Sequence, residues 1–422
     1  MEVFEIEGGK KLSGTIAVSG LKNAATPIIA ATLLSTETSV LENVPRIEDV
    51  FRMLEIVQSM GVRVEWQAEH TVAITPGDFH PRSADQEKVK KLRSSILLLG
   101  ALAARFDSFE LRQPGGCVIG ARPVEAHLDA LMKFGVHVTQ KEKGYEIDAK
   151  ERHPAKVVLR QMSVTATENA MMLAALLPGE SIIKIAACEP HVVDLGHFLE
   201  KMGAKVEGLG THTLRIVGTN ALHGAHHSII PDHNEAATYL ILGAATKSEI
   251  TVQHAREGDL DLVLEKLREF GVRFTIDGDA IAVHPTDTLE APKLFIDLRP
   301  YPGIPTDIQA PLAVLATQAK GETLVFDTLY EGRFNYALEL EKMGAKLSVL
   351  NPHQVVITGP TALRGTVVKS YDLRGGAAVI IAALLAHGKT VIEDIYQVDR
   401  GYERIEERLQ KIGAHIRRVE HT

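Results

Sequence analysis

Apolar residues recur along the chain at positions i, i+3 and i+4 in segments that end at a glycine. The segment from Met53 to Val64 is an example: an apolar helical face ends at Gly61, and alternating residues follow. Equivalent segments end at the glycines numbered 61, 135, 203, 271, 344 and 413. The 3.6-residue periodicity predicts helices, the glycine suits the left-handed residue that ends a helix, and the alternation predicts a strand.

The six segments recur about every 70 residues, which is longer than a usual solenoid repeat, so each copy is interpreted as a small α/β subdomain. Six copies form either six separate units or two groups of three. Two groups are favoured, because each group of roughly 200 residues makes a plausible domain. The turn-like stretch from Leu222 to Pro231 is the candidate boundary. A helix-like run begins at Lys22, so the first ~20 residues are candidates for membership of the other half.

The amino-acid composition argues against several classes of protein. The 422 residues are 45% hydrophobic and 24% charged, with a net charge of −8, which argues against a nucleic-acid binder. The two cysteines lie far apart, so a disulfide framework is not expected. This usage of cysteine is typical of a protein in a reducing compartment. The acidic N-terminus lacks signal-peptide features, and no apolar stretch reaches the ~20 residues of a membrane span. We therefore expect a cytoplasmic protein with no membrane or nucleic-acid partner.

A Pro- and Gly-rich loop, Gln113–Pro123, contains Cys117 with Arg122 five residues later. A nearby cation favours the thiolate, so this cysteine is a candidate reactive group; a small residue in a structural turn is the equal alternative. Cys188 lies at a predicted strand end, and there a structural role is favoured.

Basic residues next to glycine or polar turn residues recur in both halves. They are Lys22, Arg93, Arg122, Arg333, Arg374 and Arg400. Arg374 precedes the apolar run Ala377–Ala386, which places it at a predicted helix N-terminus, where anions bind readily. Together these residues suggest a phosphate or carboxylate site, although any single one is more often a surface residue.

Asp307 lies in the rigid loop Tyr301–Pro311, which leads into a predicted helix. Asp307 is a candidate base, but on local grounds the favoured interpretation is that Thr306 or Asp307 caps the helix. Histidines 223, 226, 227 and 233 lack the spacing and thiolate partners of a metal site, so no metal is expected. The chain has neither a Walker A motif nor a strand-borne G-x-G-x-x-G, so no nucleotide cofactor is expected.

Several ordered motifs match a known family. They are Ser19–Ala25, Pro114–Cys117, Gly120–Val124, Pro302–Gln309, Asp372–Arg374 and Asp399–Glu406. From about residue 5 to 418 the chain resembles the UDP-N-acetylglucosamine 1-carboxyvinyltransferases of the EPSP synthase family. The resemblance implies an α/β fold of two inverted α/β barrels, each domain built from three βαβαββ repeats. Domain I would comprise residues 1–21 and 230–422, and domain II residues 22–229, with no cofactor.

The resemblance implies transfer of the enolpyruvyl group of phosphoenolpyruvate to the 3-hydroxyl of UDP-N-acetylglucosamine, the first committed step of peptidoglycan precursor synthesis. Cys117 would protonate C3 of phosphoenolpyruvate and Asp307 would take the hydroxyl proton. Lys22 (also a catalytic residue), Arg122 and Arg400 would bind phosphate, with Arg333 and Arg374 near the carboxylate. The resemblance further implies acceptor contacts from Asn23, His127 and Ser163, substrate binding by Arg93 and Asp372, and alkylation of Cys117 by fosfomycin.

Three positions depart from the family pattern on the acceptor side. Glu125 replaces an aspartate, Thr165 replaces a glycine and His233 replaces an arginine. Threonine adds a branched side chain where glycine lets a ligand approach the backbone. Two alternatives therefore stay open: the same chemistry on another nucleotide or nucleotide sugar, and a non-catalytic regulatory paralogue. The retained Cys117 and Asp307 argue against the second.

Overall fold

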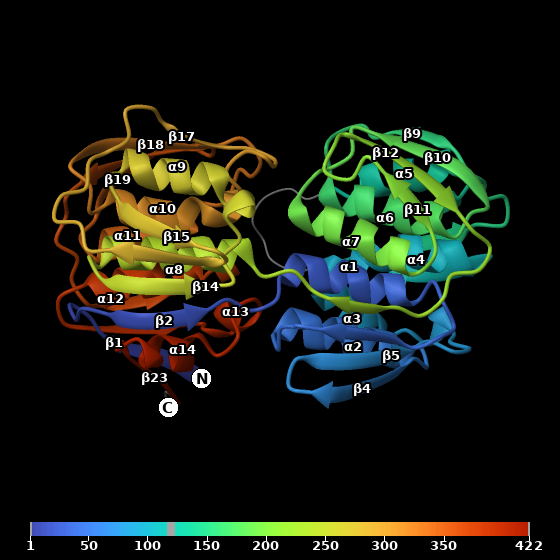
Figure 1. Cartoon of the computed structure of the whole chain (residues 1–422), viewed down its shortest axis with the longest axis horizontal. Coiled ribbons are helices and arrows are strands. Elements are labelled where there is room, and N and C mark those ends of the chain that lie inside the picture. The colour runs from blue at the N-terminus through green and yellow to red at the C-terminus, as the bar shows by residue number, and fades with distance from the viewer. Residues whose placement is uncertain (1, 116–122, 421–422) are drawn as a thin grey trace. The chain divides into compact units, whose positions relative to one another are not determined.

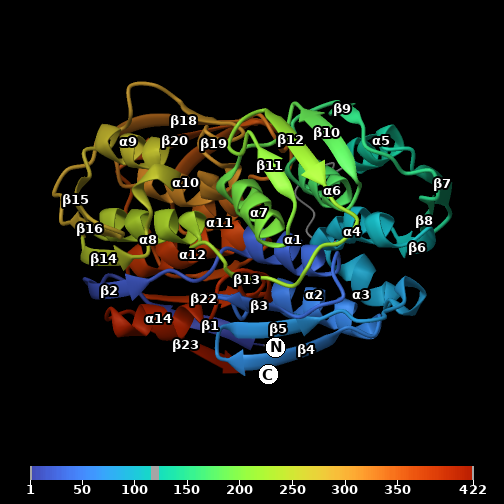
Figure 2. The same ribbon diagram turned by 45° about the vertical axis from the view of Figure 1, so that its right-hand side comes forward.

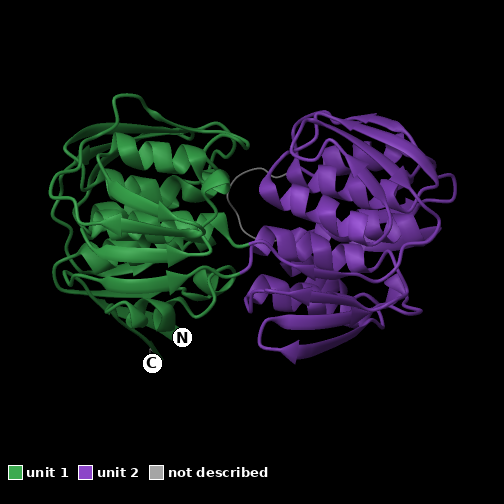
Figure 3. Cartoon of the chain, viewed as in Figure 1, with its two compact units in different colours: residues 1–19, 118–121, 231–422 green, residues 20–117, 122–230 purple. Residues whose placement is uncertain are grey.

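The computed structural model describes residues 2–115 and 123–420, and these divide into two compact units (Figure 3). Unit 1 comprises residues 2–19 and 231–420, and unit 2 comprises residues 20–115 and 123–230. The chain thus passes between the units after Ser19 and after Ile230. The family resemblance implies crossings near residues 21 and 229.

The described strands of unit 1 form three four-stranded sheets (Figure 1). In order across each sheet, the first contains β21 (Val367–Lys369), β22 (Lys389–Glu393), β1 (Glu2–Glu7) and β23 (His415–Glu420). The second contains β15 (Arg273–Asp277), β16 (Ala280–His284), β14 (Glu249–Gln253) and β2 (Ser13–Ala17). The third contains β17 (Ile296–Leu298), β18 (Gly321–Asp327), β20 (Gln354–Gly359) and β19 (Lys346–Asn351).

Unit 2 has three sheets among its described residues. One contains β13 (His226–Ser228), β3 (Ser39–Glu42), β5 (Thr71–Thr75) and β4 (Arg63–Ala68). Another contains β11 (Lys205–Glu207), β12 (Thr213–Gly218), β10 (Gly179–Lys184) and β9 (Lys156–Val158). The remaining one contains β6 (Ser108–Arg112), β8 (Gly144–Asp148) and β7 (His137–Lys141).

The helices of each unit form an inner set and an outer set (Figure 2). Apolar helices fill the interior; in unit 1 they are α8 (His233–Ala245), α10 (Gln309–Ala316) and α12 (Leu373–Leu385), and in unit 2 α1 (Lys22–Thr32), α4 (Leu98–Arg105) and α6 (Val164–Ala175). Amphipathic helices have one exposed side; in unit 1 they are α9 (Asp261–Glu269), α11 (Asn335–Lys342) and α14 (Ile405–Lys411), and in unit 2 α2 (Glu48–Ser59), α5 (Glu125–Lys133) and α7 (Pro190–Lys201). A helix that is apolar all round must be buried, whereas an amphipathic helix covers the core with one face.

Shorter helices complete the two units. They are α13 (Tyr396–Asp399), η3 (Glu257–Asp259) and η4 (Thr306–Ile308) in unit 1, and α3 (Gln86–Lys91), η1 (Pro81–Ser83) and η2 (Arg93–Leu97) in unit 2. No helix in the described ranges is both long and apolar enough to cross a membrane.

The six helix-ending glycines behave as the periodicity predicts. All six have positive φ, between 80° and 113°, and each follows an amphipathic helix. A residue with a Cβ is strained in this region, so glycine ends the helix at little cost. After five of these glycines the chain forms a two-stranded hairpin, such as β15–β16 after Gly271. After Gly413 only β23 remains, and the N-terminal strand β1 pairs with it, for example Val3 with Val419.

Strand alternation explains why the sheets cover the helices. In β12, Leu214 and Ile216 are buried whereas Arg215 between them is exposed, so one face of the sheet packs on the core and the other meets solvent. The same division holds in both units, where sheets lie outside and apolar helices inside. The α/β prediction is confirmed.

Candidate active site

Asp307 in unit 1 is held by two buried arginines. Arg333 donates from Nη2 to Asp307 Oδ1 at 2.6 Å, and Arg374 donates from Nε to Oδ2 at 3.2 Å. Asp307 lies in η4, Arg333 precedes α11, and Arg374 is the second residue of α12. Both carboxylate oxygens of Asp307 thus accept charge-assisted hydrogen bonds from arginines.

A second carboxylate, that of Asp327, is fully buried and supports this arrangement. Asp327, at the end of β18, accepts from the Thr306 hydroxyl and, at 2.6 Å, from Gln309 Nε2. Thr306 in turn accepts from Arg333 Nη1 at 2.9 Å. The local prediction that Thr306 or Asp307 caps the following helix is wrong, because the N-cap positions of η4 and α10 are Pro305 and Ile308. The side chains of Thr306 and Asp307 are both occupied by partners distant in sequence.

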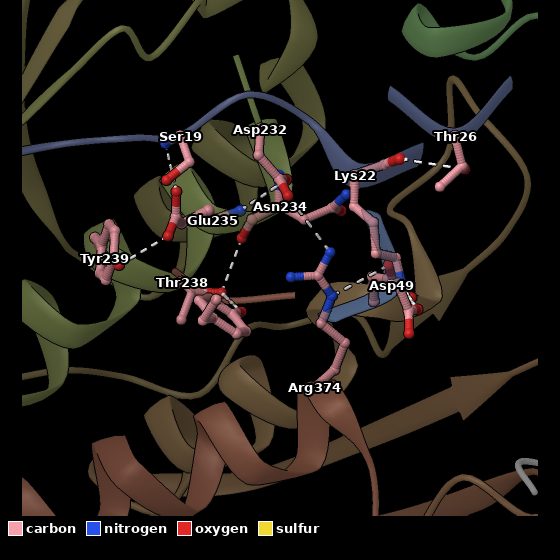
Figure 4. A network of polar contacts seen from close by, with 12 residues as sticks. Ser19, Lys22, Thr26, Asp49, Asp232, Asn234, Glu235, Thr238, Tyr239 and Arg374 are labelled. Atoms are coloured by element: carbon pink, nitrogen blue, oxygen red, sulfur yellow. Dashed lines mark hydrogen bonds and ion pairs between the residues drawn. The ribbon is translucent and has the colours of Figure 1, made fainter. Parts of the chain in front are cut away.

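The start of α12 presents Arg374 as an anion-binding group. Asp372 is the N-cap, and its Oδ1 accepts from the N–H groups of Arg374 and Gly375, both at 2.9 Å. Arg374 is only 2% exposed, and its guanidinium carbon lies 5.3 Å from the ring centre of Tyr402. Its Nη2 lies 3.7 Å from Asp232 Oδ2, and neither Nη atom has a well-formed hydrogen bond within the described chain (Figure 4). Arg374 is thus a buried cation that contacts Asp307, Asp232 and the ring of Tyr402.

His233 lies beside this cluster, at the first position of α8. Asp232 caps that helix by accepting from the N–H groups of Asn234 and Glu235 at 2.8 and 3.1 Å. Burial lowers the pKa of His233 below its usual range, against the opposing effect of the neighbouring carboxylates. His233 is therefore neutral at pH 7, and its buried Nδ1 has no hydrogen-bond partner among the described residues.

A further buried network in unit 1 joins α8 to the N-terminal segment (Figure 4). Glu235 accepts from the Ser19 N–H at 2.7 Å and from the Tyr239 hydroxyl at 2.9 Å. Arg408 of α14 pairs with the same carboxylate and donates to Ser19 Oγ at 3.0 Å and to the Ala17 carbonyl. The network fastens the end of β2 at the point where the chain leaves unit 1.

Two groups of candidate residues lie in unit 2. Lys22, the first residue of α1, donates to Asp49 Oδ2 of α2 at 3.2 Å, which fixes a cation at a helix N-terminus. Ser163 is the N-cap of α6, and its hydroxyl accepts from the Ala166 N–H at 3.4 Å. His127 of α5 lies beside that helix, with its Nε2 2.6 Å from Thr165 Oγ1.

Comparison with known proteins identifies the family of this chain. Residues 6–409 match the family model of EPSP synthase (3-phosphoshikimate 1-carboxyvinyltransferase). The chain belongs to the EPSP synthase family. A UDP-N-acetylglucosamine 1-carboxyvinyltransferase of Koribacter versatilis is 41% identical over 99% of this chain and 97% of its own length. One from Finegoldia magna is also 41% identical, over 100% of this chain and 99% of its own length.

Solved structures in this family share the fold. The enolpyruvyl transferase NikO from Streptomyces tendae matches with a TM-score of 0.89 at 26% identity, covering 100% of this chain and 99% of its own. An EPSP synthase from Acinetobacter baumannii matches with a TM-score of 0.72 at 20% identity, covering both chains fully. The fold and the sequence thus indicate the same enolpyruvyl transferase family.

The structure groups some family-predicted residues and separates others. Asp307, Arg333, Arg374 and Asp372 converge in unit 1. Arg400, also in unit 1, ends α13 and donates to Gln397 Oε1 at 3.2 Å. In unit 2, Asn23 follows Lys22 in α1, and Arg93 begins η2 and donates to the Pro123 carbonyl at 3.5 Å. Cys117 and Arg122 lie outside the described residues.

Cys188 and the histidines, for which the sequence favours no catalytic or metal-binding role, make structural contacts. Burial and the adjacent Glu189 raise the pKa of the Cys188 thiol, which disfavours the reactive thiolate. The histidines considered for a metal have separate partners. His223 contacts the Gly224 carbonyl, His226 contacts Glu42, and His227 pairs with Asp194 at 3.0 Å.

Several residues around the site were missed at the sequence level. Asp327, Glu235 and Arg408 are the main ones, and each acts through a partner far along the chain. One signal was available: Asp232 followed by Glu235 has the spacing of a capping box ahead of an apolar helix.

Glu168 of α6 was missed as well, and it gives a testable pH dependence. Its side chain is 1% exposed, and its Oε1 has no hydrogen-bond partner in the described part of the chain. Burial raises the pKa of Glu168 well above its ordinary value of 4.5, and the nearby Glu189 adds to the rise. The folded state therefore keeps this proton to a higher pH than the unfolded state. Folding stability is lost as pH rises from about 4.5 through the folded pKa.

Replacing Glu168 by glutamine should remove this loss, because the amide has the shape of the protonated acid and carries no charge at any pH. We expect the melting temperature of Glu168→Gln relative to wild type to rise between pH 5 and pH 8. Each unit of pKa shift corresponds to about 1.4 kcal/mol. Glu142→Gln, in the exposed β7–β8 turn, is the matched control and should show no such trend. A pH-independent difference for Glu168→Gln would contradict the buried-acid interpretation.

Proposed function

We propose that the protein transfers the enolpyruvyl group of phosphoenolpyruvate to the 3-hydroxyl of UDP-N-acetylglucosamine and releases inorganic phosphate. The observation that carries this proposal is the 41% identity, over nearly the whole chain, to relatives named for that activity. The cluster of Asp307, Arg333 and Arg374 supports it, because a fixed carboxylate beside buried cations suits proton removal next to an anionic substrate.

The proposed reaction proceeds by addition and elimination. The acceptor oxygen attacks C2 of phosphoenolpyruvate while Cys117 delivers a proton to C3, and Asp307 takes the proton of the attacking hydroxyl. The resulting tetrahedral ketal then loses phosphate from C2 and a proton from C3, which restores the double bond as an enol ether. Asp307 suits the base role because two arginines orient its carboxylate.

Phosphoenolpyruvate carries a carboxylate and a phosphate, so it needs several fixed cations. We assign the phosphate to Lys22, Arg122 and Arg400, and the carboxylate to Arg333 and Arg374. The two Nη atoms of Arg374 that lack well-formed hydrogen bonds support its part of the assignment. We assign the acceptor to Asn23, His127 and Ser163, with Arg93 and Asp372 as further substrate-binding residues.

The biological setting follows from the proposed reaction. It would be the committed step of peptidoglycan precursor synthesis in the cytoplasm, and so would serve cell-wall growth, cell shape and division. Alkylation of Cys117 by fosfomycin would stop it. We further propose that units 1 and 2 are the two three-repeat domains of the family, since each contains three sheets and three apolar helices within its described residues.

One observation favours a second candidate, the same reaction on a different nucleotide or nucleotide sugar. His233 is neutral and buried where the family pattern has an arginine, so the site carries one fixed positive charge fewer. A competition assay among UDP-N-acetylglucosamine, other nucleotide sugars and free nucleotides would separate the two candidates. Binding of both substrates without turnover would instead indicate a regulatory paralogue.

The test of the proposed function is phosphate release from phosphoenolpyruvate, with and without UDP-N-acetylglucosamine, in the wild type and in Cys117→Ala. We expect release to require both substrates and to fall on the order of 10²- to 10⁴-fold in the variant, the usual contribution of a positioned acid. Cys188→Ala is the control, because that thiol is buried and its pKa is raised. Absence of release from the wild type would exclude this acceptor.

A further inference from the structure

Two consecutive residues of η4 bind the two terminal nitrogens of Arg333. Its Nη2 donates to Asp307 Oδ1 at 2.6 Å, and its Nη1 donates to Thr306 Oγ1 at 2.9 Å. A guanidinium group only donates hydrogen bonds, so the Thr306 oxygen receives Nη1 through a lone pair. The contact between Thr306 and Arg333 therefore depends on where the single hydrogen of the Thr306 hydroxyl points.

Asp327 receives that hydrogen. Its Oδ2 accepts from the Thr306 hydroxyl and, at 2.6 Å, from Gln309 Nε2. Its Oδ1 accepts from the backbone N–H groups of Leu329 and Tyr330 at 2.8 and 3.3 Å. Each oxygen of Asp327 thus accepts two hydrogen bonds, and Thr306 is the donor in the bond that the two side chains share.

Burial limits how Asp327 can influence the reaction. Asp327 ends strand β18 and is 0% exposed, so its carboxylate has no surface with which to contact a substrate. Thr306 and Arg333 are 9% and 6% exposed. Any effect of Asp327 on the reaction must therefore pass through the side chains that it binds.

We propose that Asp327 is a positioning residue for the reaction and that it acts on Arg333 through the Thr306 hydroxyl. By accepting the hydrogen of Thr306, Asp327 leaves a lone pair directed at Arg333 Nη1. The guanidinium is then held at both Nη atoms, and its Nη2 orients Asp307. The inference rests on the proposed function, which assigns Arg333 to the carboxylate of phosphoenolpyruvate and Asp307 to the base.

The first test is Asp327→Asn, which keeps the size of the side chain and replaces one oxygen by an N–H donor. The backbone N–H groups of Leu329 and Tyr330 require an oxygen on their side, so the new amide nitrogen faces Thr306. Thr306 then accepts from that nitrogen, and its hydrogen is directed into the space that Arg333 Nη1 needs. We expect kcat/KM for phosphoenolpyruvate to fall about 10- to 100-fold, the value of a hydrogen bond to a charged group. The KM for UDP-N-acetylglucosamine should stay within error.

Variants of Thr306 test the same contact with a smaller change. Thr306→Val keeps the shape of the side chain and removes the hydroxyl, so it should cause the same loss, whereas Thr306→Ser keeps the hydroxyl and should retain most of the wild-type value. The double variant of Asp327→Asn and Thr306→Val should be no worse than the more impaired single variant, because both break one contact. Thr323→Val is the matched control, since Thr323 is also buried and its hydroxyl has no hydrogen-bond partner in the described ranges.

The outcomes separate a positioning role from a structural one. A lowered melting temperature of Asp327→Asn with an unchanged kcat/KM for phosphoenolpyruvate overturns the inference and leaves the proposed function intact. A serine variant as impaired as the valine variant, or additive losses in the double variant, also overturns it. No turnover by the wild type with UDP-N-acetylglucosamine overturns the proposed function and this inference with it.

Discussion

Replacing Asp307 by asparagine is expected to lower kcat on the order of 10²- to 10⁴-fold, the usual contribution of a positioned general base. The amide has nearly the shape of the carboxylate, so Arg333 and Arg374 keep one acceptor and the local fold is retained. The two arginines lose the negative charge that both now contact at 2.6 and 3.2 Å. We therefore expect phosphoenolpyruvate to bind at least as tightly as before. The result would be a fall in kcat without a rise in the KM for phosphoenolpyruvate.

Steady-state kinetics with both substrates, together with calorimetric binding of phosphoenolpyruvate, would measure the two effects separately. Asp279→Asn is the matched control, because that carboxylate is 64% exposed and pairs with His254 on the surface. A melting temperature close to that of wild type would exclude unfolding as the cause. Loss of phosphoenolpyruvate binding with an unaltered kcat would contradict the base assignment and favour a structural role for Asp307.

Local sequence patterns predicted the elements of the fold well. The six glycine-terminated helices depend on periodicity and on one conformational requirement, both of which act within a dozen residues. The same holds for Arg374, which the pattern placed at a helix N-terminus and which is the second residue of α12. A pattern that lies within one segment predicts the structure of that segment without knowledge of what packs against it.

The partners of the site residues could not be predicted in this way. Thr306 and Asp307 have the local appearance of helix caps, but Asp327 and two arginines bind them from 21 to 67 positions away. No periodicity encodes such a pairing, because it exists only after four segments converge: η4, the end of β18, the residues before α11 and the first turn of α12. Thr165 shows the same limit: the sequence marks it as a departure from the family, and only the structure shows its contact with His127.

The buried pair of Glu235 and Arg408 has the largest expected effect on stability. Glu235 is 1% exposed, and its carboxylate receives hydrogen bonds from Ser19, Tyr239 and Arg408. Burial alone would lower the pKa of Arg408, but the Glu235 carboxylate outweighs it and the net shift is upward. Removing one member of such a pair leaves a buried charge without compensation, which costs about 3–5 kcal/mol.

Glu235→Ala and Arg408→Ala should therefore each lower the free energy of unfolding by about 3–5 kcal/mol in denaturant titrations. The double variant should be less destabilised than the sum of the two, because neither charge then remains unpaired. The exposed pair of Arg215 and Glu180 across β10 and β12 is the matched control, and its removal should change stability by about 0–1 kcal/mol. Equal effects for the two pairs would show that Glu235 does not fasten the N-terminal segment. If only the variants of Glu235 and Arg408 lose stability, the contacts between α8 and the segment that follows β2 contribute much of the stability of unit 1.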